Sequence, residues 1–293
     1  MSFRRVVAGV DGRPASLAAL AVARQLAAPD AAITVAGVAV LPATLAVVGG
    51  VDDVSFARTV ADQSLDGARE ALADRAGTTF ATPDAAGVSA GLHGLAIEDG
   101  ADLLVVGASR HHGIGEVLLG NDAEATLHGA PCSVLVGPAG PAPAALRRIG
   151  VAFDGLPSGR RALRAAAALA AEHGAALEVL AVLDTRHPYA TYGTTGGYGD
   201  PLPDARELLD AAVAEIRGVV AVDPLLRSGD PVREILDLGR DVDLLVLGSR
   251  RRGAVLRVLL GDVAGKVVRR ADCAVLVVPD GDAVPGTESP RFG

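Results

Sequence analysis

Two glycine-containing segments of equal length are the parts of this sequence best suited to chemistry. Gly107 and Gly120 stand thirteen positions apart, and so do Gly248 and Gly261. Each segment follows a short apolar run typical of a buried strand and ends where a helix is expected to begin. Glycine permits a close approach of the backbone, and in an open α/β sheet ligands collect at the carboxyl ends of the strands. The spacing therefore indicates a ligand-binding loop that occurs twice.

The elements that position these loops belong to an internal duplication. Arg4–Gly12 is echoed by Arg147–Gly155 at a shift of 143 positions, and Asp102–Gly107 by Asp243–Gly248 at a shift of 141. Because the shift drifts so little, the two copies match from end to end and differ in the lengths of their loops. Each copy therefore supplies the strands and helices that position its own glycine segment.

Composition and periodicity predict an α/β fold for each copy. Half of the residues are apolar but only 3% are aromatic, which suits parallel strands covered by alanine-rich helices. Apolar β-branched runs alternate with helical patterns such as Ala15–Ala27 and Arg160–His173. We expect two tandem doubly wound five-stranded parallel sheets with helices on both faces, a Rossmann-like arrangement. The expected strands are 4–10, 32–40, 78–82, 102–107 and 133–137, then 147–153, 176–183, 219–222, 243–248 and 274–278.

The chain divides at segments that lack periodicity. Residues 1–138 form the first predicted domain and residues 146–280 the second, and the Pro/Gly/Ala-rich segment 139–145 is the linker between them. The tail 281–293 is expected to be disordered.

Charge and cysteine content exclude several classes of protein. A net charge of -8 gives no surface for a nucleic acid backbone. Cys132 and Cys273 occupy equivalent positions and are expected to be small buried hydrophobes in a reducing compartment. The uncharged stretch Ala31–Val51 contains Pro42 and several glycines, so it reads as a strand and a loop and not as a membrane span. No export signal is visible, and we expect a cytoplasmic protein.

Both glycine segments resemble the nucleotide loop of universal stress proteins. Members of that family have Gly, two residues, Gly, nine residues, Gly and then Ser or Thr after the fourth strand, and the outer glycines here have this spacing. The segments around Val10-Asp11-Gly12 and Ala130-Pro131-Cys132 are similar to the first and last strands of the family. The resemblance covers residues 3–137 and 146–279. It implies two such domains in tandem, each with the adenine nucleotide alpha hydrolase-like fold.

The resemblance also implies a ligand, which is ATP or AMP with Mg²⁺, and no cofactor that folding requires. In ATP-binding members the loop glycines let backbone N–H groups approach the phosphates, while the Asp after the first strand and the end of the second strand lie on the adenosine side. The implied first site consists of Asp11, Val38, Gly107, Arg110, Gly120 and Asn121. The implied second and weaker site consists of Asp154, Val182, Gly248, Arg251, Gly261 and Asp262.

Two departures from the family pattern distinguish the sites. Arg110 and Arg251 replace the second glycine, and Asn121 and Asp262 replace the Ser or Thr. A carboxylate about 4 Å from a phosphate charge costs roughly 4 kcal/mol at an effective dielectric constant of 20, whereas a helix N-terminus returns only about 0.3 to 1 kcal/mol. We therefore expect the first half to bind nucleotide, and the second half to bind it poorly or not at all.

Several of these residues also have a purely structural interpretation. Asn121 and Asp262 are good helix N-cap residues, and Asp11–Pro14 reads as a turn that leads into a helix. The run Arg250–Arg252 is typical of a solvated face, with a local anion site as the alternative.

Two functional classes fit these residues. The first is a stress-response regulator that binds ATP or AMP, and the second is a universal stress protein that has lost nucleotide binding and acts as a scaffold for protein partners. The sequence has no His-x-Gly-His element and no acidic cluster with a phosphoacceptor Asp, so we predict no enzymatic activity.

The resemblance implies that the two copies pair through their last strands, near Val134–Val136 and Val275–Val278. Joining the copies in one chain makes this pairing intramolecular and creates a pseudo-dimer. A further homodimer of two chains is an alternative that the sequence leaves open.

Overall fold

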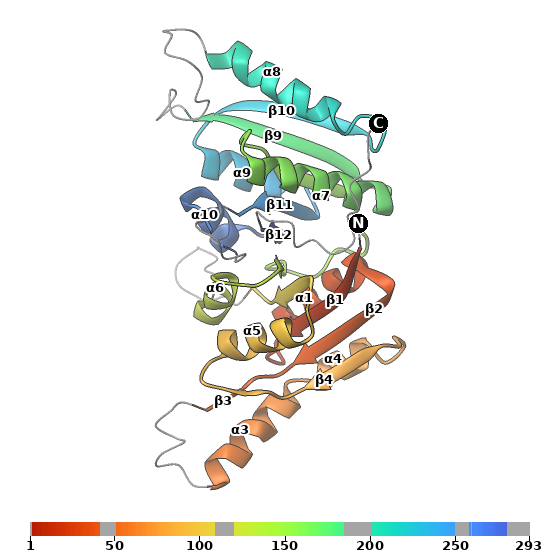
Figure 1. Ribbon diagram of the computed structural model, residues 1–293, viewed down its shortest axis with the longest axis vertical. Coiled ribbons are helices and arrows are strands. Elements are labelled where there is room, and N and C mark those ends of the chain that lie inside the picture. Colours follow the sequence, from red (N-terminus) through yellow and green to blue (C-terminus); the bar gives the residue numbers. More distant parts are fainter. Residues whose placement is uncertain are drawn as a thin grey trace.

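The computed structural model describes residues 2–41, 51–108, 120–184, 201–249, 258 and 260–279. Its main sheet has ten strands in the order β10-β9-β8-β11-β12-β7-β6-β1-β2-β4 (Figure 1). The first half supplies β1 (Phe3–Gly9), β2 (Ala27–Ala36), β4 (Thr78–Ala81), β6 (Leu103–Val106) and β7 (Ser133–Val136). The second half supplies β8 (Arg148–Ala152), β9 (Ala176–Asp184), β10 (Val222–Gly229), β11 (Leu244–Gly248) and β12 (Ala274–Val278).

Each half is a five-stranded parallel sheet in which the strand order reverses beside the first strand. Strand β1 pairs with β2 on one side and with β6 on the other, and β8 pairs in the same way with β9 and β11. The carboxyl ends of β1 and β6 therefore lie side by side, as do those of β8 and β11. This confirms the predicted doubly wound fold and places both glycine segments at a topological switch point.

The two halves meet in one antiparallel strand pair. Strand β12 pairs with β7, and Leu276 lies opposite Leu135 at the centre of the register. The other pairs are Val275 with Val136 and Val277 with Val134. The predicted pseudo-dimer through the last strands is thus confirmed, and its consequence is that the two parallel sheets merge into one mixed sheet. We call this strand pair the seam.

Two predicted strands have different bounds in the structure. The strand predicted over 32–40 is Ala27–Ala36 in the structure, so it begins and ends earlier than expected. Ala39–Val40 forms a separate short strand, β3, which pairs with β5 (Asp84–Ala85). The chain leaves the main sheet at Gly37, where a Cβ atom would overlap the carbonyl oxygen of Ala61. The predicted strand 219–222 was placed too early, because the strand is Val222–Gly229. That strand includes Pro224 and lies at the edge of the sheet, where proline is tolerated, so its pattern lacked the usual signal.

The helices cover both faces of the sheet. One buried cluster joins the sheet to α1 (Pro14–Leu26), α4 (Asp66–Ala71), α7 (Pro157–His173) and α8 (Pro201–Ala214). The opposite cluster joins it to α5 (Val88–Glu98), α6 (Asn121–Leu127), α9 (Pro231–Gly239) and α10 (Asp262–Arg270). Helix α3 (Val51–Gln63) packs beside β3 at one end of the molecule (Figure 1). Helices α1 and α7 lie close to the predicted ranges. Each begins at a proline, a residue that favours the first position of a helix.

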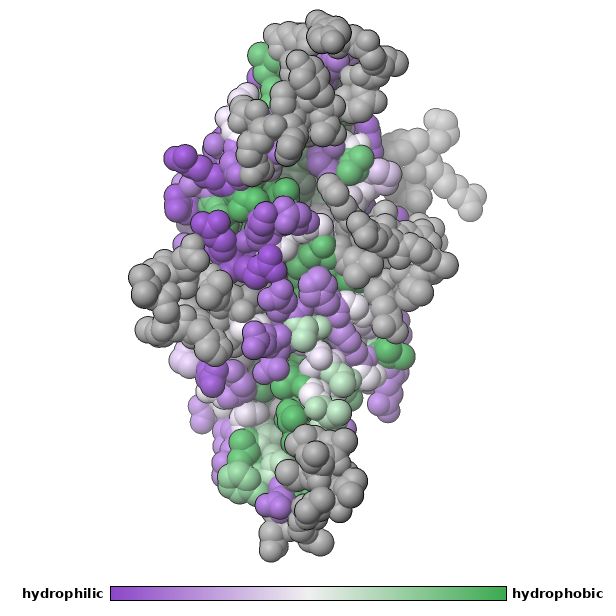
Figure 2. Space-filling view, turned by 90° about the vertical axis from the view of Figure 1, so that its left-hand side faces the viewer, coloured by the Kyte–Doolittle hydropathy of each residue, from purple (hydrophilic) through white to green (hydrophobic). Residues whose placement is uncertain are grey.

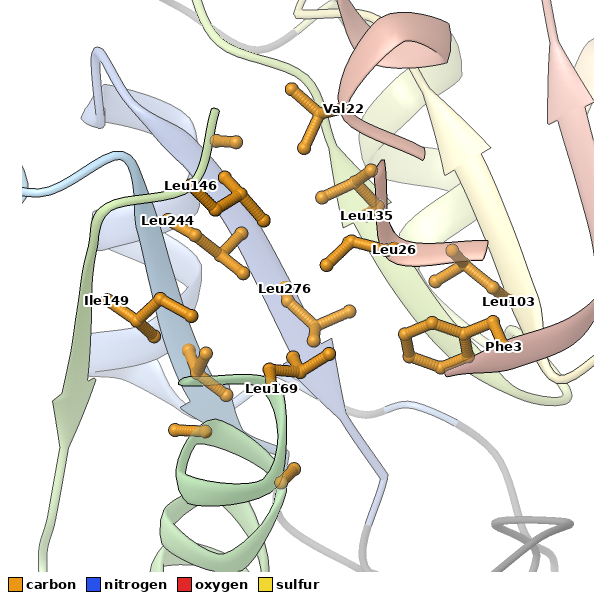
Figure 3. Packing of buried hydrophobic residues seen from close by; sticks show 14 of the residues in the cluster. Phe3, Val22, Leu26, Leu103, Leu135, Leu146, Ile149, Leu169, Leu244 and Leu276 are labelled. Carbon is orange, nitrogen blue, oxygen red and sulfur yellow. The ribbon is translucent and has the colours of Figure 1, made fainter. Parts of the chain in front are cut away.

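Both hydrophobic clusters cross the seam. On the face of α1 and α7, Leu26 and Leu135 of the first half belong to the same cluster as Leu146 and Leu276 of the second half (Figure 3). On the other face Val134 and Val275 belong to one cluster in the same way. The halves therefore share a continuous core on each side of the sheet, although each copy repeats the same fold.

An aspartate that belongs to the repeat fastens the first strand of each half. Asp102 is 4% exposed, and its carboxylate accepts hydrogen bonds from the backbone N–H groups of Arg4 at 2.9 Å and Arg5 at 3.0 Å. Asp243 accepts from the N–H groups of Arg147 and Arg148 at 2.7 and 2.9 Å. Because these bonds satisfy a carboxylate next to a buried strand, the repeated Asp is structural.

Contacts outside the sheet also connect the halves. The backbone of Val258 exchanges hydrogen bonds with Gly129 and Ala130 of the first half at 3.0 and 2.9 Å. Arg269 on α10 pairs with Glu124 on α6, with Nη1 and Oε1 2.7 Å apart. In the predicted linker, the carbonyl oxygen of Pro143 accepts from Gln25. The predicted tail 281–293 lies outside the described residues.

We predict that Leu276→Ala destabilises the whole chain by about 2 to 5 kcal/mol, because the side chain is fully buried at the seam. Urea unfolding of the intact chain measures this value. The matched control is Ile97→Ala on α5, which is 63% exposed and should change stability by less than about 0.5 kcal/mol. If the variant unfolded in two transitions and only the second half were destabilised, the shared core would be disproved.

Candidate functional site

A cavity of about 720 Å³ lies at the switch point of the first half. Its lining comes from the ends of β1, β2 and β6, from β3, and from α1, α3, α5 and α6. Five of the six residues predicted for the first site line it, namely Asp11, Val38, Gly107, Gly120 and Asn121. The sixth, Arg110, lies outside the described residues.

A cavity of about 500 Å³ occupies the equivalent place in the second half. Four residues predicted for the second site line it, namely Asp154, Val182, Gly248 and Gly261. Arg251 lies outside the described residues, and Asp262 is not among those that line the cavity. Asp184 does line it, at the position that Val40 occupies in the first half.

The first glycine of each segment allows a strand to approach a helix. A Cβ atom on Gly107 would lie 2.8 Å from the backbone nitrogen and Cα of Ser16 in α1. A Cβ atom on Gly248 would lie 2.5 Å from the carbonyl oxygen of Ser158 in α7. Both glycines are therefore needed for packing, whether or not a ligand approaches them.

The aspartate after the first strand belongs to a tight turn in both halves. The Oδ1 atom of Asp11 accepts a hydrogen bond from the N–H of Arg13 at 3.0 Å, and that of Asp154 accepts from the N–H of Leu156 at 3.1 Å. Gly12 and Gly155 adopt φ values of 74° and 75°, which side chains rarely allow. The predicted turn is confirmed, and Asp11 and Asp154 also line the two cavities.

The N-cap interpretation of Asn121 and Asp262 is wrong. The N-caps of α6 and α10 are Gly120 and Gly261, so the two polar residues occupy the first helical position. Asn121 lines the first cavity. The carboxylate of Asp262 instead lies 2.7 Å from the Nζ atom of Lys266, and its side chain is 79% exposed.

Sequence reasoning missed the helix that closes one side of the first cavity. Phe56, Val60 and Ser64 line the cavity from α3 and the residue that follows it, and Ser16 and Thr126 line it from α1 and α6. The sequence signal was the spacing of Phe56 and Val60, which places them on one helical face. That spacing alone does not distinguish a core-facing helix from one that faces a cavity.

The two thiols have no part in either cavity. The pKa of both Cys132 and Cys273 is raised to about 12, mainly by burial, with a further contribution from the carboxylate of Asp102 for Cys132 and of Asp272 for Cys273. Both thiols therefore stay protonated at neutral pH, which makes them poor nucleophiles.

The described residues contain neither a metal-binding cluster nor a membrane-spanning helix. Within them no three His, Cys, Asp or Glu side chains are grouped in a way that could hold a metal ion. No helix in the described part of the chain has the length and apolar character needed to cross a membrane.

The fold and the two cavities define a tandem α/β protein with a ligand cavity at each switch point. The model of the universal stress protein family matches residues 2–138 and 145–279. The chain therefore belongs to the universal stress protein family, with two copies of the domain in tandem.

Similar proteins carry the same family name. A universal stress protein of Thermus aquaticus is 35% identical over 133 residues, which cover 44% of this chain and 95% of that protein. A universal stress protein of Mycobacterium tuberculosis is 29% identical over 203 residues, 66% of this chain and 69% of its own length. The crystal structure of a universal stress protein from Archaeoglobus fulgidus has a TM-score of 0.67 at 20% identity, covering 95% of this chain and 97% of its own, which shows the fold.

We predict that Gly107→Ala destabilises the protein by about 1 to 3 kcal/mol, because the added methyl group meets the backbone of α1. Gly94→Ala on α5 is the matched control, since a Cβ atom there meets nothing within 4 Å. That change should stabilise the helix by about 0.5 to 1 kcal/mol. Thermal unfolding of both variants measures the difference, and equal stability would show that the close approach is not required.

Proposed function

We propose that this chain is a non-enzymatic stress-response regulator that binds ATP or AMP in the first cavity. The observation that supports this most directly is the meeting of Asp11, Val38, Gly107, Gly120 and Asn121 around one cavity. These residues come from segments that are separated in the sequence, and they match the positions at which the family resemblance implies a nucleotide.

The size and lining of the first cavity favour such a ligand. Its volume lies within the range of about 300 to 1,000 Å³ that is usual for small-molecule sites. Asp11, Ser16 and Asn121 supply polar groups, whereas Val38 and Val40 supply apolar surface. A nucleotide has the same division into a polar phosphate and ribose part and a flat apolar base.

Magnesium fits this proposal only as a partner of the phosphates. Asp11 and Asp122 line the first cavity, and no third acidic, His or Cys side chain of the described residues joins them in a metal-binding group. Mg²⁺ commonly binds through substrate phosphates, water and one or two carboxylates. One of these two carboxylates would hold the ion together with the phosphates.

We propose that the second cavity binds nucleotide poorly. Each described lining contains two carboxylates, Asp11 and Asp122 in the first cavity and Asp154 and Asp184 in the second. The first lining also contains Arg13 and Asn121, whereas the second contains no Lys, Arg, Asn or Gln side chain. Asp262 adds a negative charge beside the loop, although Lys266 offsets part of it. A phosphate would therefore meet more repulsion here than in the first half.

The geometry of the first cavity also favours a binding role over a catalytic one. Within its described lining, the hydroxyl of Ser16 donates to the carbonyl oxygen of Arg13 at 2.8 Å, and that of Ser64 donates to the carbonyl oxygen of Ala61 at 2.6 Å. Neither hydroxyl donates to a histidine or carboxylate that would activate it as a nucleophile.

The cysteine content further supports a cytoplasmic location, because the chain has two thiols at equivalent buried positions and no disulfide pattern.

We predict that calorimetric titration of the intact chain with ATP and Mg²⁺ gives one site per chain. Asn121→Asp should weaken binding at least about tenfold, because it places a carboxylate where the phosphates are expected. The matched variant Asp262→Asn makes the reverse change at the equivalent residue of the second half, and it should leave the affinity of the first cavity for ATP unchanged.

Three results would contradict the proposal in different ways. Absence of ATP and AMP binding to the intact chain would favour the scaffold function without nucleotide. Two sites of equal affinity would disprove the assignment of the second cavity. A loss of binding in Asp262→Asn alone would place the nucleotide in the second half.

A further inference from the structure

An exposed apolar cluster forms the rim of the first cavity. Val40, Phe56 and Val60 are 41%, 71% and 49% exposed, and all three line the cavity. In contrast, Phe3 and Phe153 are 1% and 4% exposed. Figure 2 shows apolar surface at the lower end of the molecule, the end at which α3 lies in Figure 1. Apolar side chains that gather at a cavity while exposed to water point to a ligand that covers them.

A single face of α3 presents this cluster. The residues from this segment that line the cavity are Phe56, Ala57, Val60, Ala61 and Ser64. Their spacing follows one side of a helix. At its carboxyl end this face enters the interior, because Ala61 is 5% exposed and Leu65 is 1% exposed. The face is therefore core at one end and cavity rim at the other.

Two contacts fix α3 in this position. The Nε atom of Arg58 donates to the Oδ1 atom of Asp84 on β5 at 3.0 Å. Nearer its end, the carbonyl oxygen of Ala61 lies so close to Gly37 that no side chain fits between them. Because the helix is held at both places, Phe56 is already positioned at the rim before a ligand binds, which lowers the entropic cost of binding.

The second half does not repeat this arrangement. A Cβ atom on Gly12 would face Ser64, whereas one on the equivalent Gly155 would face Leu208 of α8 at 2.6 Å. Beside the glycine of the turn, Leu208 of the second half therefore occupies the place that the smaller Ser64 has in the first half. No residue of α8 is among the described residues that line the second cavity. The described lining of the second cavity contains one exposed apolar residue, Leu156 at 44%, and no helix face like that of α3. Among the described residues, the apolar rim that α3 and β3 form therefore has no counterpart in the second half.

We infer that Phe56 determines which ligands the first cavity accepts, by stacking on a flat aromatic group, and that this group is the purine base of the nucleotide. The inference rests on the proposed function, since it concerns the same cavity. Polar side chains that include Asp11, Ser16 and Asn121 also line the cavity, so a ligand that uses the rim as well must combine polar groups with a flat apolar one. Bases stack favourably on aromatic side chains, and Val40 and Val60 flank the ring with further apolar surface.

The test compares ATP binding by the intact wild-type chain and by Phe56→Ala. Loss of base stacking should weaken ATP binding about tenfold. Because Phe56 is largely exposed, the melting temperature should stay within about 2 °C of the wild-type value. Ile97→Ala is the control for truncation of an exposed apolar residue away from the cavity, and it should bind ATP as the wild type does.

A second variant reports on stacking itself. The chain contains no tryptophan, so Phe56→Trp introduces a unique fluorophore at the rim. We expect this variant to bind ATP and its emission to fall as the site fills, because a stacked base quenches the indole. ATP binding without any change in emission would overturn the inference, and so would wild-type affinity in Phe56→Ala. If the wild-type chain bound no ATP, both the proposed function and the inference would fail. If the wild-type chain bound ATP and Phe56→Ala bound it with the same affinity, only the inference would fail.

Discussion

The antiparallel pairing of β7 with β12 is the interaction on which the rest of the structure depends. It turns two five-stranded sheets into one sheet whose only edge strands are β4 and β10 in the described part of the chain. All described side chains of both seam strands are buried, so an unpaired half would expose an apolar strand edge to water. Because the partner is supplied by the same chain, the pairing does not depend on protein concentration.

The seam also fixes the surroundings of the two cavities. Helix α6 begins at the first cavity and α10 begins beside the second, and the pair Arg269–Glu124 connects these helices across the seam. The backbone of Val258, which belongs to the glycine segment of the second half, bonds to Gly129 and Ala130 of the first. Each cavity therefore sits on a strand framework that both halves hold in place, although the two linings differ in charge and shape.

Much of this architecture could be predicted from the sequence because it repeats. The duplication gave the two sheets, and the strand patterns placed Asp11 and Gly107 at neighbouring strand ends. Long-range contacts without a local pattern could not be predicted. The exposure of Phe56 and the close approach of Gly107 to α1 depend on how distant elements pack. The pairing of Asp262 with Lys266 is instead a local i,i+4 pair within α10, which follows once the helix is known to begin at Asp262. Edge strand β10 was misplaced for a related reason, since Pro224 is tolerated only where no partner strand needs its N–H.

Native-state hydrogen exchange of the intact chain tests the seam most directly. If β7 and β12 hold the halves together, their backbone amides should exchange only through global unfolding, with protection equal to that of β1 and β8 and far above that of the edge strands β4 and β10. Amides of β7 and β12 that exchange much faster than those of β1 and β8 would show that the halves separate in the native state, and the shared-core account would be wrong.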